Sequence, residues 1–286
     1  MIIVKISDGL GNQLFQYAYA LYLQEAQSQR VLLDCSDINN NKRKYSVQQQ
    51  QPYDHREFGL NAFEIQIGLA DKKQISRFVS HRKKPVLLRY ADRLLLLYHT
   101  WVTEKEVLEE SFKYRRIQNY YVEGYFFSTQ YYSAVKDKLL EQISLKNDLA
   151  LRSVLKSLPR ERQIVSVHYR RGDFLQIGRN ISESSYYEDA IRYMEERVGD
   201  IFLLVFSDDT EWVKEHIRFS QPVAFASDYQ LADAEELLLM SSCDHNIIAN
   251  STYSFWGALL NQKKDKIVIS PKNWRKKIKP KEWVEL

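Results

Sequence analysis

The chain has 286 residues and a formal net charge of +4, from 41 lysines and arginines against 37 aspartates and glutamates. So small an excess of positive charge gives no reason to expect nucleic acid binding. The longest apolar runs have only the length of a buried strand, which argues against a membrane-spanning helix. A chain of this length can bury one large hydrophobic core or two of ordinary size.

The two cysteines, Cys35 and Cys243, each lie beside an apolar run, and no metal-ligand spacing links them. We expect buried, reduced thiols of a cytosolic protein. Residues 1–6 lack the charged lead and the length of a signal peptide, which fits the same compartment. Basic residues gather in 77–93 and 272–281. We expect these to be solvated faces, and the alternative is a patch that contacts an anionic membrane surface.

The N-terminal half opens with a predicted buried strand over 2–6, a turn with two glycines, and a helix. Apolar residues at helical spacing from Leu14 to Tyr22 indicate the buried face of that helix. This order is typical of the opening of a nucleotide-binding unit, and a second strand is predicted over 31–33. The dehydrogenase fingerprint G-x-G-x-x-G fails because its third glycine falls at Leu14. The two glycines therefore allow either a close approach to a ligand or an ordinary tight turn.

The middle of the chain has weaker patterns. Residues 36–61 are polar and are predicted to form a loop or a variable insertion. The pattern over 61–118 is mostly helical and charged. Aromatic residues crowd into 121–132, where we expect core packing between the two halves, with a sugar-stacking wall as the alternative.

A helix is predicted over 133–143. A charged, proline-containing break at 159–162 separates an N-terminal domain, 1–158, from a C-terminal domain, 159–286. In the second domain short apolar runs alternate with amphipathic segments, which is typical of a parallel sheet covered on both faces. One helix is predicted to begin with a capping box at Ser185. Strands are predicted over 164–167, 201–206, 223–226, 247–249 and 267–269, with helices from 185 onward and over 212–217, 232–242 and 255–260.

A polar cluster stands directly after each predicted strand of this domain. Ligands of open α/β sheets bind beyond the carboxyl ends of the strands, so clusters on one rim indicate a binding site. The clusters are His168, Arg170 and Arg171; Ser207, Asp208 and Asp209; Ser227 and Asp228; Asn250, Ser251 and Thr252; and Ser270.

Two adjacent arginines favour a diphosphate ligand, because guanidinium groups bind phosphate oxygens in pairs. Asn250 to Thr252 precede a helix whose N-terminal amides can hold a phosphate, although an ordinary N-cap explains them equally well. The chain has no Walker lysine motif, which argues against a P-loop kinase or ATPase. Asp208 and Asp209 could hold a divalent ion. We expect a structural or nucleoside-contact role instead and no metal site, because the arginines can neutralise the phosphates.

Five blocks in order resemble the α1,2-fucosyltransferases of glycosyltransferase family 11. The sequence His168-Tyr-Arg-Arg-Gly-Asp173 resembles the H-x-R-R-G-D motif of that family. The other similar blocks are Asp8 to Gln16, Phe206 to Trp212, Leu239 to Trp256 and Ser270 to Trp274, whereas 36–159 carries none.

The resemblance implies an α/β, GT-B-like protein with two Rossmann-type domains and a cleft between them. The C-terminal domain would bind GDP-L-fucose and the N-terminal domain the acceptor, with inversion and with no metal or cofactor. Arg170 would stabilise GDP as the leaving group, and His168 and Glu236 would contact guanine. The rest of the implied substrate site is Arg171, Ser207, Asp208, Asn250, Ser251 and Thr252, with Gly11, Asn12 and Gln13 lining the cleft from the other domain.

Three positions depart from the family pattern. Asp8 replaces the first glycine of the opening motif, Phe255 replaces a tryptophan, and Glu236 stands where aspartate is more frequent. The acceptor hydroxyl must lose a proton, and Asp173 and Asp8 are both candidate bases. The transition state resembles an oxocarbenium ion, so a strong base is not required.

The resemblance thus predicts transfer of fucose to the 2-hydroxyl of a terminal β-galactose, on an oligosaccharide or a lipid-linked glycan. The alternatives are a fucosyltransferase of α1,6 or O-linked type and a GDP-sugar-binding protein without catalysis. The expected setting is the cytoplasm, in O-antigen or capsule assembly, with peripheral contact with the inner membrane.

Overall fold

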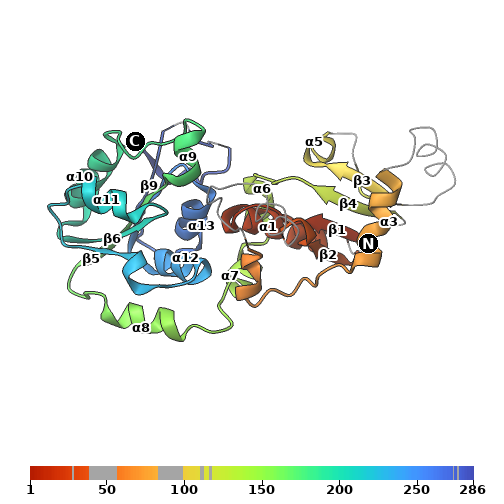
Figure 1. The fold of residues 1–286 in the computed structure, drawn as a ribbon, viewed down its shortest axis with the longest axis horizontal. Helices are drawn as coiled ribbons and strands as arrows, with labels where there is room; N and C mark the ends of the chain where they lie inside the picture. The colour runs from red at the N-terminus through yellow and green to blue at the C-terminus, as the bar shows by residue number, and fades with distance from the viewer. Residues whose placement is uncertain are drawn as a thin grey trace. The chain divides into compact units, whose positions relative to one another are not determined.

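A computed structural model describes residues 1–27, 29–38, 57–82, 99–109, 113–115, 118–272, 274–275 and 277–286, without the side chains of 79–82. The chain forms two compact units, unit 1 (Met1–Ser144) and unit 2 (Leu145–Leu286) (Figure 1). The helix α8 (Leu149–Ser157) groups with unit 2, whereas the predicted boundary placed it in the N-terminal domain. Its residues Leu151 and Val154 pack in a core cluster with Leu239 and Met240 of unit 2, which explains the difference.

In the described part of unit 1, β1 (Ile2–Lys5), β2 (Val31–Asp34), β3 (His99–Thr103) and β4 (Asn119–Glu123) form a parallel sheet in the order β2-β1-β4-β3. The first two strands were predicted. The helical prediction for 61–118 is wrong at β3, and Tyr121 lies on β4 in a core cluster with Ile3, Leu32 and Phe78.

The helix α1 (Leu10–Gln27), the longest among the described residues, packs against β1 and β2. The aromatic segment supplies the core of unit 1 itself: the Phe126 ring stacks on Tyr19 at 3.8 Å between centroids. The helix predicted over 133–143 is divided at Val135, which leaves the helical backbone conformation. The remaining elements are η1 (Gly59–Ala62), α3 (Lys72–Arg82), α5 (Glu104–Val107), α6 (Thr129–Ala134) and α7 (Lys136–Gln142).

Unit 2 contains the predicted parallel sheet, in the order β10-β9-β8-β5-β6-β7. The strands β6 and β7 follow β5 on one side of it, whereas β8, β9 and β10 lie on its other side. The strand order therefore reverses between β5 and β8. Open α/β sheets bind ligands at such a switch point. The strands are β5 (Gln163–Tyr169), β6 (Ile201–Ser207), β7 (Val223–Phe225), β8 (His245–Ile247), β9 (Val268–Ser270) and β10 (Val284–Glu285).

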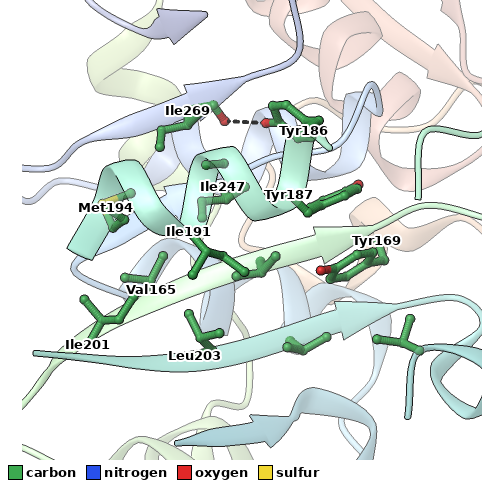
Figure 2. Packing of buried hydrophobic residues seen from close by; sticks show 14 residues of the cluster. Val165, Tyr169, Tyr186, Tyr187, Ile191, Met194, Ile201, Leu203, Ile247 and Ile269 are labelled. Carbon is green, nitrogen blue, oxygen red and sulfur yellow. Dashed lines mark hydrogen bonds between the residues drawn. The ribbon is translucent and has the colours of Figure 1, made fainter. Parts of the chain in front are cut away.

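Helices cover both faces of this sheet. On one face, α10 (Tyr186–Val198) and α11 (Thr210–His216) pack on alternate residues of β5 and β6, and Figure 2 shows this cluster. The Tyr186 hydroxyl donates to the carbonyl oxygens of Ile248 (2.7 Å) and Ile269 (3.1 Å), and Figure 2 draws the second of these bonds. The opposite face carries α8, α12 (Asp233–Ser242) and residues of α13 (Thr252–Leu260). The short elements α9 (Gly172–Gln176) and η2 (Ala226–Tyr229) complete the unit.

The start of α10 was predicted correctly, but for a reason that is wrong. Ser185 has a helical backbone conformation and its side chain makes no capping hydrogen bond. Among the described residues, no helix combines the length and apolarity that a bilayer span requires.

Candidate active site

His168 lies at the end of β5, next to the switch point. Val165, Val167 and Tyr169 point toward α10, so the alternation of the strand directs His168 to the opposite face. There its ring lies 5.8 Å from that of Tyr253 on α13, centroid to centroid. Burial, together with the charge of Arg170, lowers the pKa of His168 to about 3. The imidazole is therefore neutral at physiological pH, and its buried Nδ1 has no hydrogen-bond partner in the described structure.

Arg170 is held between two carboxylates. Its Nη2 donates to Asp173 Oδ1 at 2.6 Å, and its Nη1 lies 2.7 Å from Asp208 Oδ2. Burial raises the pKa of Asp208, although the positive charge of Arg170 opposes that rise. A guanidinium group has five N–H donors, so donors remain on Arg170 for a bound anion, and the two ion pairs fix its orientation in advance.

Arg171 has a different environment from the one its predicted role requires. Its side chain is only 6% exposed, and its guanidinium lies 3.2 Å from the centre of the Trp212 ring. Nε is 3.2 Å from Asp209 Oδ2 and Nη1 is 3.3 Å from Glu183 Oε1. These contacts make Arg171 a packing and positioning residue of this loop, and they leave Arg170 as the more accessible arginine.

Gly172 permits a close approach between this loop and the end of β6. A Cβ atom at Gly172 would lie within 3.3 Å of Asp208 Cγ and would overlap its carboxylate. The Arg171 backbone N–H donates to Asp208 Oδ1 at 2.8 Å, and the Asp209 N–H donates to Ser207 Oγ at 3.0 Å. The Asp-Asp pair and Ser207 thus support the arginine loop, as the structural interpretation of these aspartates predicted.

The segment after β8 completes the switch point. Ser251 is the N-cap of α13 and accepts from the Tyr253 N–H at 3.3 Å, so the N-cap interpretation of this residue is confirmed. Asn250 donates through Nδ2 to the Arg179 carbonyl at 2.8 Å, whereas its buried Oδ1 has no partner in the described structure. Thr252 begins α13. Unsatisfied buried polar atoms at a sheet edge indicate a place where a ligand supplies the missing bonds.

Glu236 lies on α12 beside Tyr253. Burial, with a smaller contribution from Asp233, raises the pKa of Glu236 to about 7. The Tyr253 hydroxyl donates to the Asp233 carbonyl at 2.7 Å. Burial, with Glu236 next, raises the pKa of Tyr253 well above its usual value. Tyr253 therefore adjoins both His168 and Glu236, a contact that the sequence analysis missed although Tyr253 lies in the most extended of the family-like blocks.

The other two predicted polar clusters of unit 2 have internal partners. Asp228 pairs with Lys214 at 2.8 Å, and Ser270 Oγ accepts from Lys279 Nζ at 3.1 Å. Lys279 is itself buried and pairs with Glu285 at 2.8 Å, so this lysine does not belong to the solvated face predicted for 272–281. Most of the basic stretch 77–93 lies outside the described residues.

The three predicted residues of unit 1 lie at the start of α1. Gln13 is completely buried and donates to the carbonyl oxygens of Asp8 and Glu57, both at 2.7 Å. It also accepts from the Gly59 N–H at 3.0 Å. The prediction that Gln13 lines a cleft is therefore wrong, because all of these bonds hold the neighbouring loop in place. Gly11 is buried, and Asn12 is half-buried.

Sequence relatives cover the whole chain. The model of Glycosyl transferase family 11 matches residues 1–285. The O-antigen biosynthesis glycosyltransferase WbnK of Escherichia coli is 32% identical, over 98% of this chain and 99% of that protein. An alpha-1,2-colitosyltransferase of Escherichia coli is 28% identical over 100% and 99%. The human galactoside alpha-(1,2)-fucosyltransferase 1 is 29% identical over 58% of this chain and 48% of that protein.

The fold also has counterparts of known structure. The fucosyltransferase NodZ from Bradyrhizobium superposes with a TM-score of 0.54 at 12% identity, over 92% of this chain and 95% of that one. This similarity confirms the predicted GT-B-like, α/β fold. Together with the family match over nearly every residue, it confirms the resemblance: the chain belongs to glycosyltransferase family 11.

Proposed function

We propose that this protein transfers L-fucose from GDP-L-fucose to the 2-hydroxyl of a terminal β-galactose, with inversion and without a metal ion. Unit 2 binds the donor and unit 1 the acceptor. The observation that carries the proposal is Arg170, held by Asp173 and Asp208 at the switch point of the unit 2 sheet, beside the neutral His168. The names of the relatives, with their α-1,2 linkages, support the type of bond.

The donor base is recognised by Glu236 and His168. Guanine presents its N1–H and its 2-amino group side by side, and a carboxylate accepts such a pair through both oxygens. Adenine lacks this pair of donors, so Glu236 selects guanine. The buried Nδ1 of His168 and Oδ1 of Asn250 have no hydrogen-bond partner in the described structure, and both gain one from the nucleotide.

Arg170 acts on the leaving group. The bond between the anomeric carbon and the β-phosphate oxygen breaks, and its electron pair leaves with GDP, where a preplaced guanidinium stabilises the new charge. The acceptor oxygen bonds to the opposite face of the anomeric carbon and releases its proton. Asp173 is ion-paired with Arg170 at 2.6 Å, which favours an orienting role for this carboxylate and leaves Asp8 as the other candidate base.

One alternative concerns the donor sugar. Colitose is L-fucose without its 3-hydroxyl, and one relative over the whole chain is named a colitosyltransferase. Competition between GDP-L-fucose and GDP-colitose for the same acceptor measures the ratio of their kcat/KM values. A higher kcat/KM for GDP-colitose would make GDP-colitose the donor, and the roles of the residues of unit 2 would stay the same.

The test is GDP release from GDP-L-fucose in EDTA, with and without a panel of β-galactosides that includes lactose. We expect acceptor-dependent release, and linkage analysis of the product distinguishes α1,2 from α1,6 or O-linked transfer. Arg170→Ala should lower kcat by about 10²–10³, as the loss of one preorganised donor does elsewhere. Arg192→Ala, on an exposed arginine of α10, is the matched control.

Two outcomes would overturn the proposal. Calorimetric GDP binding without release on any acceptor would favour a GDP-sugar-binding protein. Turnover at the wild-type rate by a folded Arg170→Ala variant would move the leaving-group site away from β5. The proposed setting in O-antigen assembly, at the cytoplasmic face of the inner membrane, is tested separately by recovering the protein from washed membranes at low and high salt.

A further inference from the structure

The carboxyl edge of the unit 1 sheet brings together an aromatic ring and two carboxylates. Asp8 follows β1, Glu104 follows β3, and Tyr125 follows β4. These strands are neighbours, because the sheet order is β2-β1-β4-β3. The order reverses between β1 and β4, since β2 lies on the other side of β1, and this is the position where an open parallel sheet receives its ligand.

Tyr125 is the exposed member of an otherwise buried aromatic group. Its neighbours Phe126, Tyr131 and Tyr132 are at most 7% exposed, whereas Tyr125 keeps 39% of its surface accessible. The Tyr125 ring is nearly parallel to that of Phe127, with 5.2 Å between centroids. An exposed ring that packs on a neighbour offers a flat apolar surface with one polar end.

Hydrogen bonds fix both ends of Tyr125. Its hydroxyl donates to Asp8 Oδ2, and its backbone N–H donates to Glu104 Oε2 at 2.9 Å. Gly124 allows the second contact, because a Cβ atom there would lie 2.9 Å from Glu104 Oε2 and would collide with the side chain. The ring is therefore a rigid platform whose ordering adds little to the entropy cost of binding.

The two carboxylates keep capacity to accept hydrogen bonds. Glu123, on the same edge, is neutralised by Lys5 at 2.7 Å. Asp8 and Glu104 have no cationic partner among the described residues, and one oxygen of each accepts a hydrogen bond from Tyr125. A carboxylate has about four acceptor positions, so several remain for donors from a ligand. Sugar hydroxyls are such donors, and the apolar face of galactose matches an aromatic ring.

We propose that this edge of unit 1 binds the terminal galactose of the acceptor. The Tyr125 ring lies against the apolar face of the sugar, and Asp8 and Glu104 accept hydrogen bonds from its hydroxyls. This inference rests on the proposed function, which needs a galactoside site in unit 1. It names Asp8, which replaces a glycine of the family motif, as a residue that sets acceptor specificity in this chain.

The backbone at Asp8 provides a substitution that separates binding from folding. Its φ is +63°, a conformation that aspartate tolerates and glycine adopts freely. Asp8→Gly removes the carboxylate and relaxes the backbone, so its melting temperature should not fall below that of the wild type. Tyr125→Phe keeps the ring and removes only the hydroxyl, whereas Tyr125→Ala removes the platform.

Steady-state transfer is measured for these variants with acceptor and donor varied in turn. We expect Tyr125→Ala to raise the acceptor KM about tenfold and Asp8→Gly about fivefold, with Tyr125→Phe near twofold and the donor KM unchanged. Leu108→Ala removes an exposed apolar side chain of unit 1 and Glu64→Gln neutralises an exposed carboxylate, and these are the matched controls. Acceptor KM values of Tyr125→Ala and Asp8→Gly within about twofold of the wild type would overturn the assignment.

A binding readout distinguishes failure of this site from failure of the proposed function. Saturation-transfer NMR detects methyl β-D-galactopyranoside on the protein in the presence of GDP, and calorimetry measures GDP alone. The assignment predicts a saturation-transfer signal in the wild type that is lost in Tyr125→Ala, with GDP affinity equal in both. An equal signal in both proteins overturns the sugar site even if GDP binds. Absent GDP binding would instead contradict the donor site of unit 2.

Discussion

The proposed contact between Glu236 and guanine predicts that donor affinity depends on pH through the pKa of this residue. Burial raises that pKa from 4.5 to about 7, and guanine binds the carboxylate form in the proposed complex. A proton on Glu236 then competes with the nucleotide. With a pKa near 7, the ionised fraction falls from about 0.9 at pH 8 to about 0.1 at pH 6, so affinity for a GDP-sugar falls about tenfold.

His168 does not contribute to this dependence, because its pKa of about 3 keeps it neutral over the whole range. The assay is isothermal titration of GDP-L-fucose at pH 6, 7 and 8, since the diphosphate of a GDP-sugar, unlike that of GDP, does not titrate there. Glu236→Gln should bind at least about tenfold more weakly at pH 8 and show no slope with pH. Glu215→Gln, on an exposed glutamate of α11, is the control.

The dependence of folding stability on pH supplies an independent check on the raised pKa of Glu236. A carboxyl group with a raised folded-state pKa holds its proton more tightly when folded, so its contribution to stability falls as pH rises from 4.5 through about 7. Above that window the buried charge destabilises the unit, by at most roughly 3 kcal/mol. Glu236→Gln should therefore raise the melting temperature at pH 8 and change it little at pH 4.5. Affinity that is independent of pH in the wild type, or an equal slope in Glu236→Gln, would refute this reasoning.

Three further outcomes follow from packing and charge. Gly257→Ala should destabilise unit 2 by about 1–3 kcal/mol in urea unfolding, because a Cβ atom there would lie 2.8 Å from Met240 Cγ; a neutral result would mean that α12 moves freely. Arg171→Lys should lower the melting temperature while donor KM changes little, since a lysine does not reproduce the stacked, two-carboxylate contact with Trp212 and its neighbours. Full transfer activity after dialysis against EDTA is expected, and restoration of lost activity by Mg²⁺ would contradict it.

The sheet of unit 2 could be predicted from the sequence because most of its strands are continuous apolar runs. Ile201 to Phe206 is buried on both faces, and such a run has few other interpretations. The strand β3 was missed because it is an edge strand in the described sheet and its residues are mostly half-buried. The strand β10 spans two residues, which is too short for any periodicity.

The candidate site was predicted in part, for a physical reason. Candidate residues at the ends of strands, such as His168 and Arg170, follow recognisable apolar runs and share one edge. The role of Gln13 depends on Glu57 and Gly59, which lie far along the chain, and a local motif contains no information about such partners. The same holds for Tyr125 and Asp8, whose hydrogen bond joins the ends of β4 and β1.

The different environments of the two adjacent arginines follow from the twofold period of a strand. In the parallel pair β5 and β6, Tyr169 aligns with Ser207, so the next positions match Arg170 with Asp208 and Arg171 with Asp209. Both pairs are present as ion pairs. Successive residues point to opposite faces, and Arg171 accordingly packs on α11 through Trp212.

Arg170 is then left on the side of His168, whose buried Nδ1 has no hydrogen-bond partner in the described structure. In this chain the two arginines are matched by two aspartates after the neighbouring strand. One pair anchors the loop in the core, and the other orients the cation that, in the proposed mechanism, stabilises the leaving group. Replacing each aspartate in turn should show this division. Asp209→Asn removes an anchor and should lower the melting temperature more than kcat, whereas Asp208→Asn frees Arg170 and should lower kcat more than the melting temperature.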